Sequence, residues 1–428
     1  MPPSSIRTAL CLGLCCLGSF ANLAAADFGS RDLPLFETGE WSFTDSSVSG
    51  EAFWHHGTVT FTHSATGITR TTTTFYDGGD TWRFRFFADR PGEWTFLSSA
   101  ADPDQDGHHG TIQVGDPVSP DKHGPIRTMG DRYVVQEADG GWRAIYHQVF
   151  QNGESDKDGS AEFAGLKFVS YLNKTESEQL QMIETHLDRA EAHGISGIFI
   201  SVEAWRDGST GLPRLDTFRL FERLQERIWA RNMHFHMWMW GDNGGTDSVT
   251  MLPELYRYLG ARISALGSWS ADRGYDTGGK MPLGLSFNSH ASWGEHLRQY
   301  LPWNGPIGVR SHASHQLDYI SNDIHKINLF DDEPFDGYPS ELPQDPYHIT
   351  RWMYDDLPLT GQPHIYMRRL WLGRSSLTTD QTLACIWGFM FGGGAAADLG
   401  FGEPDQQSFE RPERFLHIRR FLVDTERW

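Results

Sequence analysis

Residues 232–243 read NMHFHMWMWGDN, a mostly apolar and aromatic run that stops at Gly241, Asp242 and Asn243. An exposed antiparallel strand alternates apolar and polar side chains, whereas a strand that is buried on both faces is apolar throughout. A buried helix is the weaker interpretation, because the run is short and glycines follow it at once. The run therefore predicts a buried parallel strand, whose carboxyl end lies where the loops of an α/β barrel form an active site.

Length and charge limit what the rest of the chain can be. The chain has 428 residues and a net charge of −20, with no run of Lys or Arg. This length allows two domains, one of them a barrel of roughly 250 residues. The acidic balance argues against nucleic acid and anionic membranes as partners. The 16 Trp and 27 Phe residues include aromatic faces that can stack on sugar rings, although most must belong to the core.

The first residues resemble a secretory signal. A single Arg7, an apolar stretch and small residues before Asp27 predict a signal peptide over residues 1–26, and hence a secreted or periplasmic protein. Three of the four cysteines lie in this segment, so Cys385 alone remains and no intramolecular disulfide can form. Cys385 stands in an apolar segment, which favours a buried hydrophobe over a nucleophile.

Short β-prone runs separated by turn residues fill the next part of the chain. They predict an antiparallel β-sandwich over residues 27–115. In TWRFRFFA, Trp82, Phe84 and Phe86 face one way, and the arginines between them face the other. Residues 116–126, rich in Pro and Gly, are expected to be a linker to the second domain.

Strand-like and helix-like segments then alternate over residues 127–428, which predicts a (β/α)₈ barrel. The clearest helix is TESEQLQMIETHLDRAEAHG, in which Thr175 and Glu178 form a capping box and Gly194 is the stop. Further helices are expected over residues 215–231 and 252–266. The eight candidate strands span residues 142–150, 194–205, 232–242, 266–276, 305–312, 324–334, 362–372 and 385–400.

Several stretches resemble one family of secreted bacterial glycosidases. They are FRFFADRPGEWTF, HFHMWMWGDN, YRYLGARISALGSWSADRGYD, NLFDDEPFDG and RRLWLGRSSLTTDQTLACIWGFMFGGGAA. In that family a small N-terminal β-sandwich of undetermined function precedes an apiosidase-like (β/α)₈ barrel. The resemblance covers nearly the whole mature chain and implies a glycoside hydrolase that acts on a plant or algal polysaccharide or oligosaccharide. No cofactor is expected.

The chain departs from the related retaining glycosidases at two places. Those enzymes carry an acid/base Glu at the end of strand 4 and a nucleophilic Glu at the end of strand 7. Here Asp276 would replace the first, and Met367 and Arg368 stand where the second is expected. The missing carboxylate leaves a catalytically silent carbohydrate-binding barrel as the alternative function, with a lyase as a third.

Hydrolysis of a glycosidic bond needs one protonated and one ionised carboxyl group. Besides Asp276, the candidates at strand ends are Glu203, which could instead pair with an arginine, and the cluster Asp331, Asp332 and Glu333. Strands 4 and 6 are not neighbours, and their separation suits the ~6.5–9.5 Å of an inverting pair. The hypothesis is therefore an inverting hydrolase with Asp276 as acid and Glu333, or else Asp332, as base.

Other residues near the predicted strand ends could bind the substrate. Trp205 and Trp240 are candidate sugar platforms, and Asp242 either binds a sugar hydroxyl or caps the following segment. The remaining candidates are Arg310, His312 and Arg368. The arginines either hold an acidic or sulfated sugar or neutralise the nearby acids.

Two stretches raise the question of a metal. Residues 99–110, SAADPDQDGHHG, resemble a calcium loop but lack the Glu that a full loop requires, so a solvated hairpin loop competes with ion binding. His234 and His236 share one face of their strand, as two ligands would. No third ligand is adjacent, which favours hydrogen-bonded core histidines, and no metal site is predicted.

Overall fold

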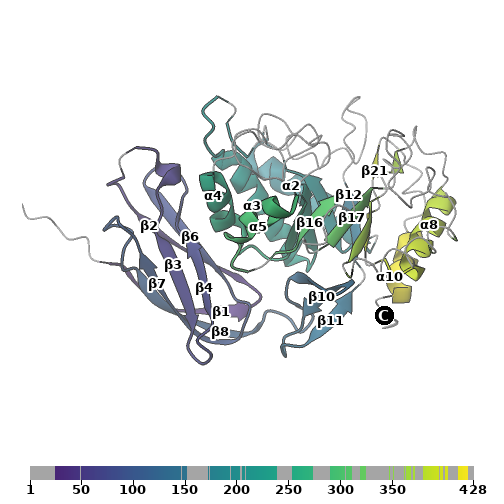
Figure 1. The fold of residues 1–428 in the computed structure, drawn as a ribbon, viewed down its shortest axis with the longest axis horizontal. Helices are drawn as coiled ribbons and strands as arrows, with labels where there is room; N and C mark the ends of the chain where they lie inside the picture. Colours follow the sequence, from purple (N-terminus) through teal and green to yellow (C-terminus); the bar gives the residue numbers. More distant parts are fainter. Residues whose placement is uncertain are drawn as a thin grey trace, which may run out of the picture.

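The computed structural model shows a β-sandwich beside a closed barrel (Figure 1). The structure describes residues 25–48, 50–145, 147–151, 172, 174–192, 194–202, 205–207, 209–238, 253–272, 290–303, 305–310, 319–323, 347, 350, 361, 363–367, 370–371, 379–394, 396–398, 401–402 and 413–422. Among these residues, no helix combines the length and the apolar character that a membrane crossing requires.

Two sheets make up the N-terminal domain, which confirms its predicted β-rich character. The first sheet has the order β1 (Asp27–Leu35), β8 (His109–Pro117), β7 (Gly92–Ser99), β3 (Thr58–His63) and β4 (Thr69–Thr73). The second has the order β2 (Thr38–Thr44), β6 (Thr81–Phe87) and β5 (Phe75–Tyr76), and a short helix, η1, spans Ala52–Trp54. The sandwich is not purely antiparallel as predicted, because β1 pairs with β8 in parallel. A hairpin forces antiparallel pairing only between consecutive strands, and these two strands are the first and last of the domain.

The predicted alternation on β6 is confirmed. Trp82, Phe84 and Phe86 are at most 1% exposed and face the sandwich core, where Phe84 stacks on Trp41 at 5.4 Å between ring centroids. The turn before β7 requires its glycine: Gly92 has φ +113°, and a Cβ atom there would lie 2.8 Å from Nε2 of His63.

Eight described strands close into the barrel, and every neighbouring pair is parallel. They are β12 (His147–Gln151), β13 (Gly197–Ser201), β14 (His234–Trp238), β15 (Trp269–Asp272), β16 (Ile307–Arg310), β17 (Tyr319–Asp323), β18 (His364–Met367) and β20 (Ala396–Asp398). A separate antiparallel sheet of β9 (Ile126–Met129), β10 (Arg132–Gln136) and β11 (Trp142–Ile145) precedes the first barrel strand. Outside the barrel, β19 (Leu370–Trp371) pairs with β21 (Phe401–Gly402).

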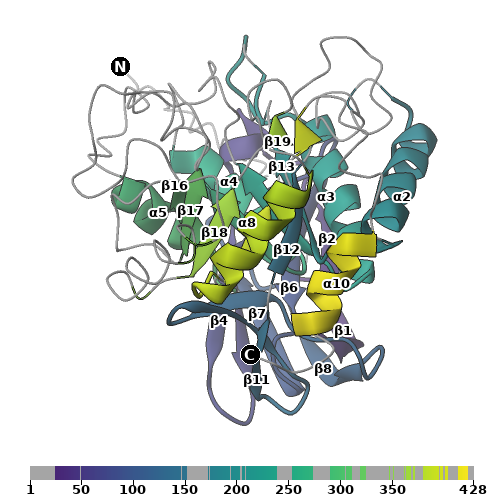
Figure 2. The same cartoon turned by 90° about the vertical axis from the view of Figure 1, so that its right-hand side faces the viewer.

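Helices cover the outside of the barrel. The described ones are α2 (Glu176–Ala192), α3 (Leu215–Ala230), α4 (Pro253–Ile263), α5 (His290–Arg298), α8 (Thr379–Phe391) and α10 (Glu413–Leu422), and Figure 2 shows α8 and α10 on the side away from the sandwich. The predicted start of α2 is confirmed, since Glu178 accepts a hydrogen bond from the Thr175 backbone N–H at 2.8 Å, and the Thr175 hydroxyl accepts one from the Glu178 N–H. The helix gives way to Gly194, which has φ +74°.

Three predicted strands were misplaced. The predicted first barrel strand, residues 142–150, is divided between β11 of the separate antiparallel sheet and the barrel strand β12. The sixth barrel strand is β17 and not residues 324–334, which lie outside the described residues. The predicted eighth strand, residues 385–400, is divided between the end of α8 and the short β20. An apolar run such as CIWGFMF satisfies a buried strand and a buried helix equally, and only its extension back to Thr379 favours the helix.

The sandwich packs against α3 and α4 through a buried charge network. Arg85, on the polar side of β6, is 5% exposed, and its Nη1 donates to Oε1 of Glu222 on α3 at 2.8 Å. Glu222 also accepts two hydrogen bonds from Arg262 of α4, at 2.7 and 2.9 Å. Burial would raise the pKa of Glu222, but the charges of Arg262 and Arg85 outweigh it and lower the pKa to about 2. The arginine face of β6 is therefore an interface and not a solvated surface.

Candidate functional site

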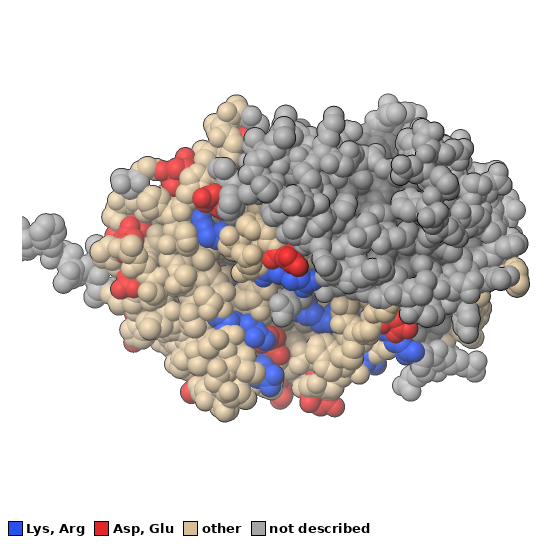
Figure 3. All heavy atoms as spheres, viewed as in Figure 1, with Lys and Arg blue, Asp and Glu red and all other residues tan. Residues whose placement is uncertain are grey.

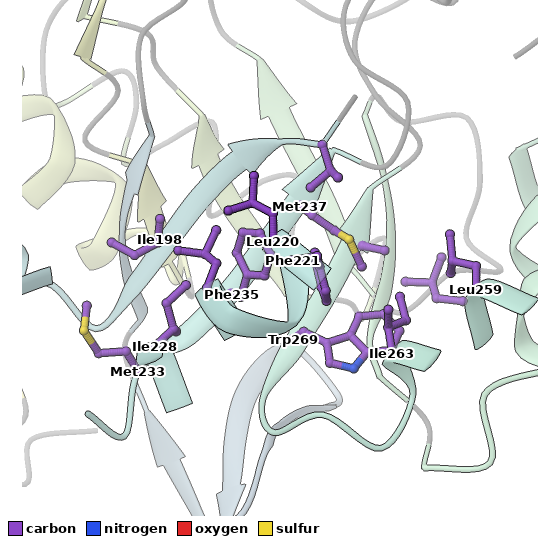
Figure 4. Close-up of a cluster of buried hydrophobic side chains, with 14 of the residues drawn as sticks. Ile198, Leu220, Phe221, Ile228, Met233, Phe235, Met237, Leu259, Ile263 and Trp269 are labelled. Carbon is purple, nitrogen blue, oxygen red and sulfur yellow. The ribbon is translucent and has the colours of Figure 1, made fainter. Parts of the chain in front are cut away.

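The inner face of the barrel is identified by the strand β14. Phe235 and Met237 belong to the apolar layer between the strands and the helices (Figure 4), and the ring of Phe235 lies 5.0 Å from that of Phe221 on α3. Alternate residues of a strand face opposite sides. His234 and His236 therefore face the inside of the barrel.

The register between neighbouring strands shows which residues of the other barrel strands also face the inside. His236 pairs with Ser270, Asp272 with Gly308, and the pairings continue through β16 to β20 and back to β12. The last residue of each strand then occupies an inner-face position at the carboxyl end: Gln151, Ser201, Trp238, Asp272, Arg310, Asp323, Met367 and Asp398. Three aspartates and one arginine thus stand at the end of the barrel where this fold places its active sites.

The structure relates the predicted site residues to these strand ends. Arg310 is the last residue of β16. Most of the others follow a barrel strand within a few residues but lie outside the described residues: Glu203, Trp240, Asp242, Asp276, His312 and Arg368. Asp332 and Glu333 also lie outside them, further along the chain from the end of β17.

Sequence reasoning missed Asp272, Asp323 and Asp398. Each ends a short strand-like run, SWSAD, YISND or AAD. These runs are only weakly apolar, so their pattern predicts a buried strand less strongly than the aromatic runs near them do. Asp323 lies immediately before the predicted sixth strand, residues 324–334, and was therefore not among the candidates at strand ends.

The predicted role of Trp205 as a sugar platform is wrong. Trp205 is 1% exposed and packs between Phe218 and Phe221 of α3, with ring centroids 4.9 and 5.6 Å away. Its ring faces are covered by protein, so it anchors the loop after β13 and does not form the predicted sugar platform. In the same loop Asp207 accepts hydrogen bonds from the Ser209 hydroxyl and from the backbone N–H groups of Thr210 and Ser209, and these bonds lower its pKa to about 2.

A buried hydrogen-bonded network of His234, His236, Ser268 and Ser270 lies inside the barrel. Nδ1 and Nε2 of His234 lie 2.7 and 2.8 Å from the hydroxyls of Ser268 and Ser270. Nδ1 of His236 lies 2.6 Å from the same Ser270 hydroxyl. The interpretation as hydrogen-bonded core histidines is confirmed for His234 and His236. Both support the layer directly below Trp238 and Asp272.

Replacing His234 by Phe is expected to lower the free energy of unfolding by roughly 1–3 kcal/mol, because the buried hydroxyl of Ser268 loses its ring partner. Urea denaturation followed by tryptophan fluorescence measures the change. The control is His109→Phe on β8, where the side chain is 52% exposed, and a change within about 0.5 kcal/mol is expected. Equal stability of His234→Phe and wild type would refute a structural role for this hydrogen-bonded network.

Three carboxylates of the sandwich come close enough to consider a cation. Oxygens of Asp45, Asp102 and Asp104 lie within 4.8 Å of one another. Those of Asp45 already accept hydrogen bonds from Ser47 and from the Gln105 amide. Asp102 and Asp104 belong to the loop of residues 99–110, where Asp102 accepts hydrogen bonds from the Asp104 backbone N–H and from the Ser47 hydroxyl.

The groove between the sandwich and the barrel is a charged seam and not a second pocket of the barrel. It has a volume of about 1080 Å³, and Figure 3 shows Lys, Arg, Asp and Glu side chains gathered along the junction of the two domains. The cations there are paired with carboxylates of the same groove, for example Arg83 with Asp77 at 2.8 Å and Arg231 with Glu191 at 3.7 Å. Lys122 lies in the same groove, where burial lowers its pKa to about 8 against the opposing effect of Glu37.

Comparison with known proteins adds to this picture at the level of fold. Residues 33–101 match a family described as a domain of unknown function, DUF5060. No curated protein matches the sequence.

Among solved structures, the chain is similar to one from Bacteroides vulgatus that is named, provisionally, a glycoside hydrolase. The TM-score is 0.65 at 14% identity, with 92% of this chain and 79% of that chain covered. An endoglucanase from Pseudomonas stutzeri gives a TM-score of 0.37 at 12% identity, covering 54% and 85% of the two chains. A family 1 β-glucosidase from Thermotoga maritima gives 0.36 at 9% identity, covering 60% and 88%. The first of these similarities shows that the chain shares its overall fold with a protein assigned to the glycoside hydrolases.

Proposed function

We propose that the protein is a glycoside hydrolase that cleaves a plant or algal polysaccharide or oligosaccharide with paired carboxylates. The observation that carries this proposal is the row of strand-end residues at the carboxyl end of the barrel. Asp272, Asp323 and Asp398 supply the acidic groups that the hydrolysis of a glycosidic bond needs. The fold shared with the Bacteroides vulgatus protein agrees with this function.

The second carboxylate, which the seventh strand lacks, comes in this proposal from a neighbouring strand. Met367 ends the seventh strand, β18, and is in register with Asp323 on one side and Asp398 on the other. The acid is a carboxylate of strand 4, Asp276 or Asp272. The base is Asp323, which takes the place first predicted for Glu333 because β17 is the sixth strand.

The separation of the strands favours inversion of configuration. Neighbouring strands lie ~4.8 Å apart, so strands two places apart, such as β15 and β17, are separated by ~9–10 Å. An inverting pair needs ~6.5–9.5 Å to admit a water molecule, whereas a retaining pair needs only ~5–5.5 Å. The proposed pair therefore activates water and forms no covalent intermediate.

Side chains around this pair would orient the sugar. Trp240 and Asp242 follow β14, where an aromatic face and a carboxylate suit a sugar ring and its hydroxyls. Arg310, His312 and Arg368 come from strands 5 and 7, and together they would favour a substrate with carboxylate or sulfate groups. Glu203, after strand 2, remains an alternative catalytic carboxylate.

An assay of sugar release from a panel of plant and algal glycans tests the function. We expect new reducing ends from at least one glycan, and proton NMR of the released anomeric centre is expected to show inversion. The competing function, a silent carbohydrate-binding barrel, is favoured by the absence of a carboxylate in strand 7. Glycan binding without any turnover by the folded protein would support that alternative and contradict hydrolysis.

A further inference from the structure

The sandwich reaches the active-site end of the barrel through residues 51–57, which include η1. The ring of Phe53 packs edge-on against that of Tyr258 on α4, 5.4 Å between centroids. Arg257 Nη2 donates to the backbone oxygens of Phe53 and Trp54, at 3.3 Å each. Barrel helices run opposite to the strands, so the first turns of α4 lie near the carboxyl ends of the strands. Arg257 and Tyr258 lie in the second turn of α4, so the segment is held against the outer helix layer on the half of α4 that is nearer the carboxyl ends of the strands, and Figure 1 shows the short purple helix next to α4.

This segment presents an aromatic ring surrounded by polar groups. Trp54 is partly exposed, and His55, His56 and the nearby Glu254 of α4 are exposed. Nδ1 of His56 lies 3.2 Å from the backbone oxygen of Trp54. A sugar ring binds to such a surface by stacking its C–H face on the indole, while its hydroxyls form hydrogen bonds with the surrounding polar groups.

Arg257 fixes this arrangement at an energetic cost. Its side chain is 6% exposed, and Nη1 has no hydrogen-bond partner among the residues that the structure describes. Burial lowers the pKa of Arg257 to about 10, although the charge of Glu254 opposes the shift. Burying a guanidinium that has an unpaired nitrogen destabilises a fold. The hydrogen bonds from Arg257 to Phe53 and Trp54 hold this segment in one position despite that cost. Arg257 is thus a positioning residue for Trp54, which is partly exposed and also packs against the core of the barrel.

We propose that Trp54, His55 and His56 of the sandwich form a distal subsite, which binds a sugar unit of the chain whose glycosidic bond is cleaved at the barrel mouth. This inference rests on the proposed function. The occupant is an extended glycan, because a short substrate that fills only the barrel mouth does not reach the neighbouring domain. The N-terminal domain is then part of the substrate site and not only a support for the barrel.

Replacing Trp54 by Ala tests the subsite. For a polymeric substrate we expect KM to rise roughly five- to tenfold, which corresponds to the loss of one stacking contact. Both kcat and KM for the shortest cleavable oligosaccharide are expected to stay unchanged. The double variant His55→Ala/His56→Ala alters only exposed side chains and leaves the Trp54 ring in place, at the loss of the contact between His56 and the Trp54 backbone oxygen, so it tests the polar part of the same surface.

The matched control is Trp142→Ala. Trp142 on β11 is 48% exposed but belongs to the sheet that precedes the first barrel strand, far from the strand ends. A rise in KM that is the same for long and short substrates would overturn the inference, as would unchanged kinetics in both subsite variants. If the wild-type protein cleaves no glycan at all, the proposed function itself fails, which is a different result from an active enzyme that is insensitive to these substitutions.

Discussion

Asp323→Asn is expected to lower kcat by roughly 10²- to 10⁴-fold, the usual contribution of a general base. The amide keeps the size of the side chain but cannot accept the proton of the attacking water. Asp323 ends β17 at the level of Met367. Because the proposed base acts on the attacking water in the chemical step, the loss is expected in kcat, and KM is expected to change much less. Steady-state kinetics on the glycan found in the release assay measure both constants.

Two matched variants decide which carboxylate is the base. Asp398→Asn removes the aspartate at the same level on the other side of β18, and Glu333→Gln removes the residue favoured by sequence alone. We expect both to retain much more activity than Asp323→Asn. Loss of activity in Glu333→Gln with near-normal turnover in Asp323→Asn would restore the first assignment, and retention of configuration would exclude the water-activating mechanism.

Glu222→Gln is expected to destabilise the protein by roughly 3 kcal/mol, because it removes the carboxylate that two buried guanidinium groups share and leaves Arg85 with Glu40 and Arg262 with Asp77. Arg262 is fully buried and Arg85 is 5% exposed, so water cannot replace the lost charge. Urea denaturation at neutral pH measures the difference. The control is Glu226→Gln, one turn along the same helix and exposed, for which a change within about 0.5 kcal/mol is expected. Equal midpoints for Glu222→Gln and wild type would show that the network contributes nothing to stability.

The same network predicts how stability depends on pH. The pKa of Glu222 is lowered from 4.5 to about 2 in the folded protein. A carboxyl group with a lowered folded pKa contributes stability above its unfolded pKa and loses it as the pH falls through the folded value. Wild type is therefore expected to lose roughly 3 kcal/mol between pH 4.5 and pH 2 that Glu222→Gln does not lose.

Local patterns predicted much of the fold. The period-two alternation of Trp82, Phe84 and Phe86 correctly identified the core face of β6, and the capping box at Thr175 correctly located the start of α2. The alternate histidines His234 and His236 were correctly read as core. Each of these features depends on residues close together in sequence, where side-chain periodicity and backbone hydrogen bonding act directly.

Predictions failed where distant segments compete for the same role. CIWGFMF was read as a strand, but packing selected a helix and left the barrel position to the less apolar Ala396–Asp398. Likewise YISND, and not the more apolar run after it, pairs with β16 and β18. Hydrophobicity alone does not rank such candidates, because closure of the barrel depends on all of its strand pairs at once.

From its sequence alone, this chain specifies a β-rich N-terminal domain, strands and helices that alternate after it, and the buried face of regular strands such as β6. Local propensity and periodicity are sufficient for these features. Packing between distant segments settled the rest: Arg85 became a buried partner of Glu222, and Trp205 became core and not a sugar platform. Strand register settled which residues end level with Met367, because register depends on pairing between segments far apart in the chain.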